Sequence, residues 1–387
     1  MHYLDHAATT PLLPVARAAI DAELDRVGNP SSVHAAGRAA RAVVESARER
    51  LAAAFGVDPI EVLFTSGGTE GDNLGVAGLF RARRDADPLR TRIVLSPTEH
   101  HAVDDTARWL AAHDGAELVW LAVDPTGRVD PESLRAALRD PSAVALVSVM
   151  WANNEIGTVQ PIAELAAIAR EHGVPMHTDA VQAAGPLHVD LSTVDVDVMT
   201  ITGHKLGGPV GTGALMLRRG VVLQPVLHGG GQERQVRSGT LDTAGAAGFA
   251  AAVDAVVAGR ADTVARVSAL RDRLVGAVRQ AVPDVIVTGE AAPRLPGTAH
   301  FLFPECDGDA LLMLLDAAGI AASTGAACSS GVTEPSHVLA AIGVEESLAR
   351  GALRCSLGWS STDDDVAATG AVIGGAVQRA RLAAAVR

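Results

Sequence analysis

The chain has 387 residues, of which 48% are hydrophobic, so it is not a disordered protein and it can bury a core large enough for two domains. A formal net charge of −13 argues against nucleic acid or an anionic membrane surface as a main partner, because both attract clustered Lys and Arg. Aromatic residues make up only 3% of the chain, which removes the stacking platform that proteins use to bind single-stranded nucleic acid.

The N-terminal sequence MHYLDHAATTP carries an acid at Asp5 and no apolar segment, so we expect no signal peptide. We expect no membrane span either, because the longest apolar stretch, residues 246–259, is interrupted by Asp254. These features predict a cytoplasmic protein. The chain has three cysteines, Cys306, Cys328 and Cys355, which cannot form a disulfide framework and whose spacing matches no zinc-ligand pattern.

Between about residues 36 and 220, short apolar runs rich in β-branched residues alternate with Ala-rich helical stretches. Because the runs are continuously apolar, we expect a largely parallel sheet with helices on both faces. The last run follows its predecessor closely enough to pair antiparallel. The prediction is an α/β domain with a mostly parallel, mixed, seven-stranded sheet built from residues 61–66, 92–97, 116–123, 144–151, 174–180, 197–202 and 213–219.

From about residue 243 the pattern changes to long helices, followed by shorter strands near residues 285–289 and 297–303. This pattern predicts a second, smaller α+β domain. We expect residues 1–15 to join that domain, residues 16–249 to form the large domain, and residues 250–387 to form the rest of the small one.

Candidate chemistry follows the strands, where open α/β sheets bind their ligands. FTSGGTEGDN (64–73) leads from a strand through Gly68 into a helix near Thr69, a turn whose free backbone N–H groups suit a phosphate. In HTDAVQAAG (177–185), Asp179 could bind a metal, relay protons or cap the next helix. In ITGHKLGGP (201–209), a desolvated Lys205 could act as a nucleophile toward carbonyls, whereas a solvated lysine would be inert. Together, a phosphate turn, an acid and a lysine form the set that pyridoxal phosphate needs.

A further stretch, STGAACSSG (323–331), places Cys328 among small residues with glycine on both sides. Buried structural cysteines usually have bulky apolar neighbours, so two interpretations stay open for this setting: a surface loop that happens to carry a thiol, and a nucleophile on a movable loop.

The chain resembles the cysteine desulfurases, fold-type-I pyridoxal-phosphate enzymes of the class V aminotransferase group. The similarity runs nearly end to end, and the segment after Cys328 resembles the longer catalytic loop of the housekeeping iron–sulfur-assembly subgroup. The motifs that carry it are YLDHAATTP, GNPSSVH, FTSGGTEGDN, TEHHAV, NNEIGTVQPI, HTDAVQAAG, TGHKLGGP, HGGGQERQVRSGT, STGAACSS, EPSHVL and LRCSLG.

The resemblance implies a role for each matching residue. Lys205 would hold pyridoxal phosphate covalently, Asp179 would face its ring nitrogen, and His100 would stack on the ring and move protons. Arg354 would bind the substrate carboxylate, together with Asn154, and Cys328 would carry sulfur as a persulfide. The remaining cofactor contacts would come from Gly68, Thr69, Asn154, Gln182, Thr202, His204 and, across a dimer interface, Thr240.

The resemblance therefore implies an L-cysteine desulfurase that forms a homodimer, releases alanine and passes sulfur to an acceptor protein. It does not name that acceptor, and the chain ends without the longer C-terminal tail of related housekeeping enzymes. A selenocysteine lyase or a class V aminotransferase on the same scaffold stays open, as does a non-enzymatic scaffold protein.

Other readings of single motifs are weaker. HGGGQ at His228 is similar to a lipase oxyanion strip, but the chain has no G-x-S-x-G elbow. The pair His100 and His101 lacks a metal-ligand set at usable spacing, so we predict no metal and an exposed His101 on a helix. We expect Cys306 and Cys355 to be inert packing thiols.

Overall fold

The computed structural model describes residues 1–325 and 336–384. All seven strands predicted for the large sheet are present in one sheet, in the order β2-β8-β7-β6-β5-β3-β4. β8 pairs antiparallel with both β2 and β7, and the other pairings are parallel, so the mixed, mostly parallel sheet is confirmed. The strands are β2 (Val62–Thr65), β3 (Arg92–Leu95), β4 (Glu117–Trp120), β5 (Val144–Ser148), β6 (Met176–Asp179), β7 (Val198–Thr202) and β8 (Gly213–Leu217).

Helices cover both faces of this sheet, as the continuous apolar strands require. Successive strand residues point to opposite faces, so Val94 packs in one core while Ile93 and Leu95 pack in another. One face is covered by α3 (Gly68–Asn73), α4 (Leu79–Ala86) and α5 (His101–His113), and the other by α2 (Ala35–Phe55), α6 (Pro131–Ala137), α7 (Ile162–Glu171) and the first half of α8 (Thr243–Ala281).

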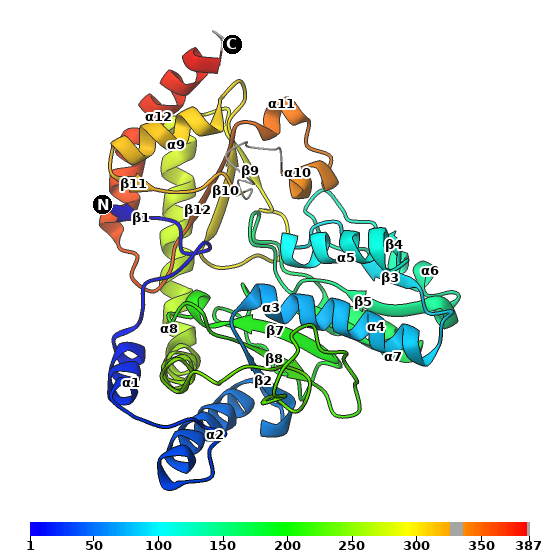
Figure 1. Ribbon diagram of the computed structural model, residues 1–387. Helices are drawn as coiled ribbons and strands as arrows, with labels where there is room; N and C mark the ends of the chain where they lie inside the picture. The colour runs from blue at the N-terminus through cyan, green and yellow to red at the C-terminus, as the bar shows by residue number, and fades with distance from the viewer. Residues whose placement is uncertain (326–335, 385–387) are drawn as a thin grey trace.

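A second group of elements lies around a three-stranded antiparallel sheet, β12-β10-β9, beside the two-stranded parallel pair β1-β11 (Figure 1). Its hydrophobic core contains Leu4 from the N-terminus together with Phe301 and Leu353. On this basis we propose that residues 1–15 and 250–387 form the small domain and residues 16–249 the large one. The elements are β1 (His2–Tyr3), β9 (Ile286–Thr288), β10 (Thr298–Leu302), α9 (Gly308–Ala317), β11 (Ile320–Ala321), α10 (His337–Ala341), α11 (Glu346–Ala349), β12 (Ala352–Ser356) and α12 (Asp363–Ala384).

The sequence predicted several long helices after residue 243, but α8 is one continuous helix of 39 residues that runs beside both groups of elements (Figure 1). Within residues 1–325 and 336–384 it is also the one helix whose length and composition would suffice to cross a membrane, although we expected no such segment. Its apolar window is 44% buried, and it packs against α2, α12 and α1 (Pro14–Leu24). These contacts are those of a core helix that joins two parts of the protein.

The carboxyl ends of the parallel strands meet at one edge of the large sheet, and this edge positions the candidate site. β6 ends at Asp179, and its neighbour β7 runs into the 3₁₀ turn Gly203–Lys205. β2 leads to the Gly67–Gly68 turn. Residues far apart in sequence are therefore brought together by the order of the strands.

Candidate active site

A cavity of about 370 Å³ opens at this edge of the sheet. It is bounded by the ends of β2, β6 and β7, by the N-terminus of α5 and by β12. The structure brings ten of the twelve predicted site residues to its walls: Gly68, Thr69, His100, Asn154, Asp179, Gln182, Thr202, His204, Lys205 and Arg354.

Lys205 ends the 3₁₀ turn after β7, and the chain then turns away through Gly207, whose φ of 74° favours glycine. The Lys205 Nζ donates to the carbonyl oxygens of Ala7 and Ala8, 2.5 and 2.6 Å away. Burial, with a smaller contribution from the nearby Arg354 cation, lowers the pKa of Lys205 from 10.5 to about 8. A useful fraction of this amine is therefore neutral, and nucleophilic, near neutral pH.

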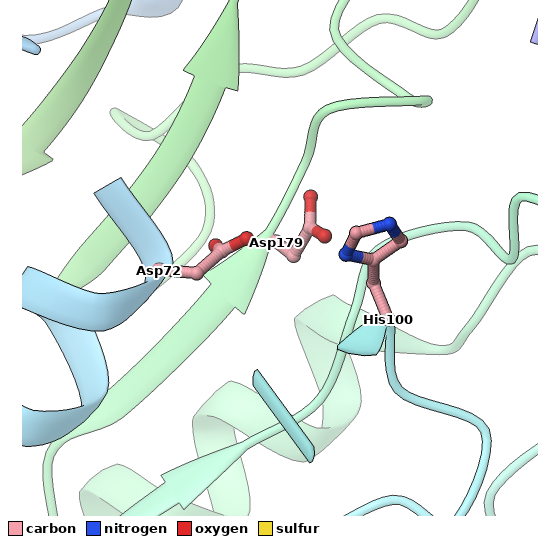
Figure 2. Close-up of side chains that lie close together, drawn as sticks. All are labelled: Asp72, His100 and Asp179. Atoms are coloured by element: carbon pink, nitrogen blue, oxygen red, sulfur yellow. The ribbon is translucent and has the colours of Figure 1, made fainter. Parts of the chain in front are cut away.

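Asp179 lies at the end of β6 with its carboxylate beside the ring of His100 (Figure 2). Its Oδ1 accepts the backbone N–H of Val181 at 2.8 Å, so the capping role is present, yet the carboxylate also lines the cavity. Burial, reinforced by the neighbouring Asp72 carboxylate, raises the pKa of Asp179 to about 8. A cationic group entering the cavity would reverse that shift, because it would pair with the ionised form.

His100 is the residue that begins α5, and its Nδ1 accepts the backbone N–H of Ala102 at 3.1 Å. This bond places the ring proton on Nε2. Burial, followed by repulsion from the Lys205 cation, lowers the pKa of His100 to about 4. The imidazole is therefore neutral at pH 7, and its Nε2–H is available as a hydrogen-bond donor.

The turn between β2 and α3 forms the opposite wall. Gly67 has a φ of 155°, and an added Cβ on Gly68 would lie only 3.0 Å from Val181 Cγ2, so both glycines suit the close approach of this turn. The hydroxyl of Thr202 donates to the Thr212 carbonyl at 3.0 Å and keeps its lone pairs available. The exposed Thr69 adds a second hydroxyl at the wall.

Arg354 reaches the cavity from the middle of β12 and is only 4% exposed. Its Nη2 binds Asp5 Oδ1 at 2.8 Å, and its Nη1 donates to the Asn154 carbonyl at 2.9 Å. Each Nη carries a second proton, and the buried Nε has no hydrogen-bond partner among the described residues. The guanidinium is thus fixed in place while donors remain for a carboxylate ligand.

Two predicted site residues are not in the cavity as the structure describes it. Cys328 lies outside the described residues, although residues on both sides of its segment, Gly325 and His337, line the cavity. Thr240 is exposed and does not line the cavity of its own chain. A contact to a second chain, as the sequence resemblance implies, stays a prediction.

Sequence reasoning missed several residues of the cavity wall. Asp72 and Glu99 are buried carboxyl groups that line it, and Glu155 and His337 line it at the side nearest Gly325. His101 was expected to be exposed, but it is half-buried because its ring packs edge-on against His337, with centroids 4.9 Å apart. The motifs TEHHAV, NNEIGTVQPI and EPSHVL, which contain most of these residues, were the available signal.

Three side chains that line the cavity lie in a row, as Figure 2 shows: Asp72, Asp179 and His100. One nitrogen or oxygen of each lies within 4.8 Å of the others, and His101, Asp104 and Asp105 form a second such group on α5. This spacing alone would also admit a metal ion, so the absence of a metal stays a prediction from the sequence.

The donor set suits pyridoxal phosphate, the cofactor that the sequence indicates. Asp179 is a buried carboxyl group whose one hydrogen bond among the described residues comes from the Val181 N–H, so it can still accept a cationic ring N–H. Lys205 supplies an amine of lowered pKa, and the Gly68 turn leaves space that a larger side chain would fill. A cation acceptor, an amine and an anion-binding turn thus share one cavity of suitable size.

The other two cysteines are unsuited to chemistry. Cys306 and Cys355 are buried, and burial raises the pKa of their thiols to about 11 and about 12. Only a very small fraction of either thiol ionises at neutral pH, which agrees with the expectation that both are inert.

Comparisons with known proteins agree with this geometry. The profile of the aminotransferase class-V family matches residues 2–368. An IscS-like cysteine desulfurase from Mycobacterium tuberculosis is 54% identical over 385 residues, 99% of this chain and 98% of the relative, and a cysteine desulfurase IscS from Methanosarcina thermophila is 41% identical over 98% and 92%.

Solved structures give the same result. A NifS-like protein from Rickettsia africae superposes with a TM-score of 0.86 at 32% identity, covering 98% of this chain and 99% of that one. DndA from Streptomyces lividans superposes with a TM-score of 0.78 at 36% identity, covering 92% and 99%. The chain therefore belongs to the aminotransferase class-V family and, within it, to the cysteine desulfurases.

Proposed function

We propose that this protein is a pyridoxal-phosphate-dependent L-cysteine desulfurase that converts L-cysteine to L-alanine and stores the sulfur on Cys328. The observation that carries the proposal is the shared cavity, which joins Lys205, Asp179 and Arg354 at a site bordered by the residues flanking the Cys328 segment. The family's relatives named as cysteine desulfurases support the same reaction.

Pyridoxal phosphate, when bound, would supply the electron-withdrawing ring that weakens bonds at the substrate's α and β carbons. Lys205 would hold it covalently, while Asp179 would bind its ring nitrogen and His100 would cover the ring. The phosphate would lie at the turn formed by Gly68, Thr69, Thr202 and His204, with Thr240 reaching it from a second chain, and Gln182 and Asn154 would contact the ring oxygen side.

Substrate binding follows from the charges on the wall. Arg354 would bind the substrate carboxylate through its remaining N–H donors, held in position by Asp5 and by the Asn154 carbonyl. Because burial keeps the His100 imidazole neutral, it would donate a hydrogen bond from Nε2 to a group bound in the cavity. To move protons, as the resemblance implies, His100 would take up a proton from the substrate and return it from the imidazolium form.

Cys328 would accept the sulfur. Its thiolate attacks the sulfur of the bound cysteine, the bond between that sulfur and the β carbon breaks, and the carbon takes up a proton. The products are a Cys328 persulfide and alanine, so atoms and electrons balance without an external oxidant. A sulfur-acceptor protein, for example an iron–sulfur scaffold, would then take the outer sulfur of the persulfide. We further propose that the enzyme works as a cytoplasmic homodimer.

The test compares the purified protein with Cys328→Ser. The wild type should show a visible absorbance band from bound cofactor and release one alanine per persulfide formed on Cys328, located by peptide mass spectrometry. Cys328→Ser should keep the band and lose alanine release, because a hydroxyl cannot store sulfur as a persulfide.

Three outcomes would contradict the proposal. Cysteine-dependent alanine release by well-folded Cys328→Ser would exclude Cys328 as the sulfur carrier. A wild-type protein that binds the cofactor but exchanges amino groups, without releasing sulfur, would be an aminotransferase instead, and preference for selenocysteine over cysteine would identify a lyase for that substrate.

A further inference from the structure

Asp72 lies on α3, which packs closely on the sheet together with the turn that follows it, Leu74–Gly78. Added Cβ atoms would lie 2.6 Å from the Thr200 side chain at Gly71 and 2.7 Å from the His177 ring at Gly75. Two glycines four residues apart share one helix face, so this face can touch β6 and β7 directly. Asp72 follows Gly71 directly and is only 1% exposed.

Among the described residues, no cation is paired with this buried carboxyl group. Asp72 Oδ1 has no hydrogen-bond partner among the described residues, and it lies 3.5 Å from Nε2 of His177. That imidazole lies within hydrogen-bonding distance of two hydroxyls, Ser148 at Nδ1 (2.9 Å) and Thr200 at Nε2 (3.2 Å). Burial lowers the pKa of His177 to about 4, so it is neutral and does not neutralise an Asp72 carboxylate.

The titratable groups that face Asp72 from other elements are mostly acids. Asp179 lies on β6, and Glu99 follows β3; one Glu99 oxygen accepts the Met150 N–H, and the other has no partner within residues 1–325 and 336–384. His100 completes the row in Figure 2 and is neutral. Two carboxylates this close in a buried site cannot both be ionised without a cation between them.

The surroundings decide which of the two carboxyl groups is ionised. Asp179 accepts the Val181 N–H and is attracted by the Lys205 cation, whereas Asp72 has only a hydrogen bond with Thr200 in its favour. Burial raises the pKa of both carboxyl groups to about 8, and a cation that enters the cavity would lower the pKa of the carboxyl group that faces it. The pair therefore carries at most one negative charge, and that charge belongs on Asp179.

We propose that Asp72 is a positioning residue, a carboxylic acid kept neutral beneath Asp179, which leaves Asp179 as the one carboxylate of the pair that binds the cationic ring nitrogen of the cofactor. The second half of this statement rests on the proposed function. An ionised Asp72 would compete for the same cation and would draw the ring proton away from Asp179.

The protonation state can be read directly by infrared spectroscopy on the holoenzyme, with aspartate labelled by ¹³C at its side-chain carboxyl so that Glu99 does not contribute. At pH 7 we expect a labelled carboxylic-acid band that loses intensity in Asp72→Asn and keeps it in Asp179→Asn. No acid band in the wild type, or loss in Asp179→Asn with retention in Asp72→Asn, would overturn the proposal. Asp72→Ala, expected to lose the same band, replaces Asp72→Asn should the amide fail to fold.

The pH dependence of unfolding gives an independent readout that a purely structural role would not produce. A raised pKa in the folded protein means that stability falls as pH rises from about 4 to about 8 and is constant above. The ratio of the unfolding constants of wild type and Asp72→Asn should therefore rise by up to tenfold per pH unit between pH 5 and 8.

A ratio that is constant over this range would refute a neutral Asp72. Neither readout requires turnover, so a protein that fails to release alanine from cysteine could still confirm the protonated Asp72. The failure of the proposed reaction and the failure of this inference are thus separately visible.

Discussion

The lowered pKa of Lys205 predicts how fast the cofactor attaches to the protein as pH changes. With a pKa of about 8 in place of 10.5, about one Lys205 in ten is neutral at pH 7, against roughly one in three thousand for an ordinary lysine. Because only the neutral amine attacks an aldehyde, attachment at pH 7 should be on the order of a hundred times faster than for a free lysine of equal nucleophilicity.

The assay mixes protein stripped of cofactor with pyridoxal phosphate and follows absorbance in a stopped-flow instrument between pH 6 and 11. The rate should rise about tenfold per pH unit at low pH and level off above about pH 8. Free Nα-acetyl-lysine, measured in parallel, corrects for titration of the cofactor itself. Lys205→Ala gives the background, and borohydride reduction followed by peptide mapping should place the label on Lys205.

Replacement of Arg354 by Gln separates the two causes of the shift. The midpoint of the curve of rate against pH should move to higher pH, since a cation that repels the Lys205 ammonium is removed. It should stay well below 10.5, because burial is the larger cause of the lowered pKa. A wild-type rate that keeps climbing tenfold per unit beyond pH 9 would refute the reasoning, as would a label on any other lysine.

Three further predictions concern the surroundings of the site. Glu233→Gln should lower the free energy of unfolding, measured by urea titration, by about 3 kcal/mol, because Glu233 is buried, pairs with Arg48 at 2.8 Å and accepts the Phe64 N–H. A loss below about 1 kcal/mol would contradict a buried ion pair. Thr240→Ala should weaken cofactor binding only in the dimer, and a monomer fully active at high dilution would exclude a shared site. Cys306 and Cys355 should resist iodoacetamide at pH 8 until the protein unfolds, as followed by mass spectrometry; labelling of the folded protein would contradict their raised pKa values.

The large sheet was predictable because each of its strands is a separate apolar run bounded by turn residues. β6 and β7 end in Asp179 and Thr202, and the general rule for open α/β sheets places such ends at a common edge. The order of the strands in the sheet cannot be predicted from any single apolar run. Even so, most of the predicted contacts line one cavity, because the motifs sit at strand ends.

The small sheet was harder to predict. β12 (ALRCS) places Arg354 and Cys355 inside an apolar pattern, and an arginine in that position argues against a buried strand. The contradiction is resolved by Asp5, which neutralises the guanidinium from a segment about 350 residues away in sequence. A contact between residues this far apart in sequence cannot be predicted from a local sequence pattern, and the same is true of the pairing between the two-residue strands β1 and β11.

Asp72 shows a different limit. In FTSGGTEGDN it reads as an ordinary polar residue in the first turns of a helix, and helical periodicity alone does not show that it faces the sheet. The deciding feature is the close contact that Gly71 and Gly75 allow with Thr200 and His177, which turns a polar helix face inward. The helix then continues through a π turn, Leu74–Gly78, whose residues are all buried. Such turns are frequent at functional sites, and this one carries Gly75, whose close contact with His177 keeps the helix against β6 at the floor of the cavity.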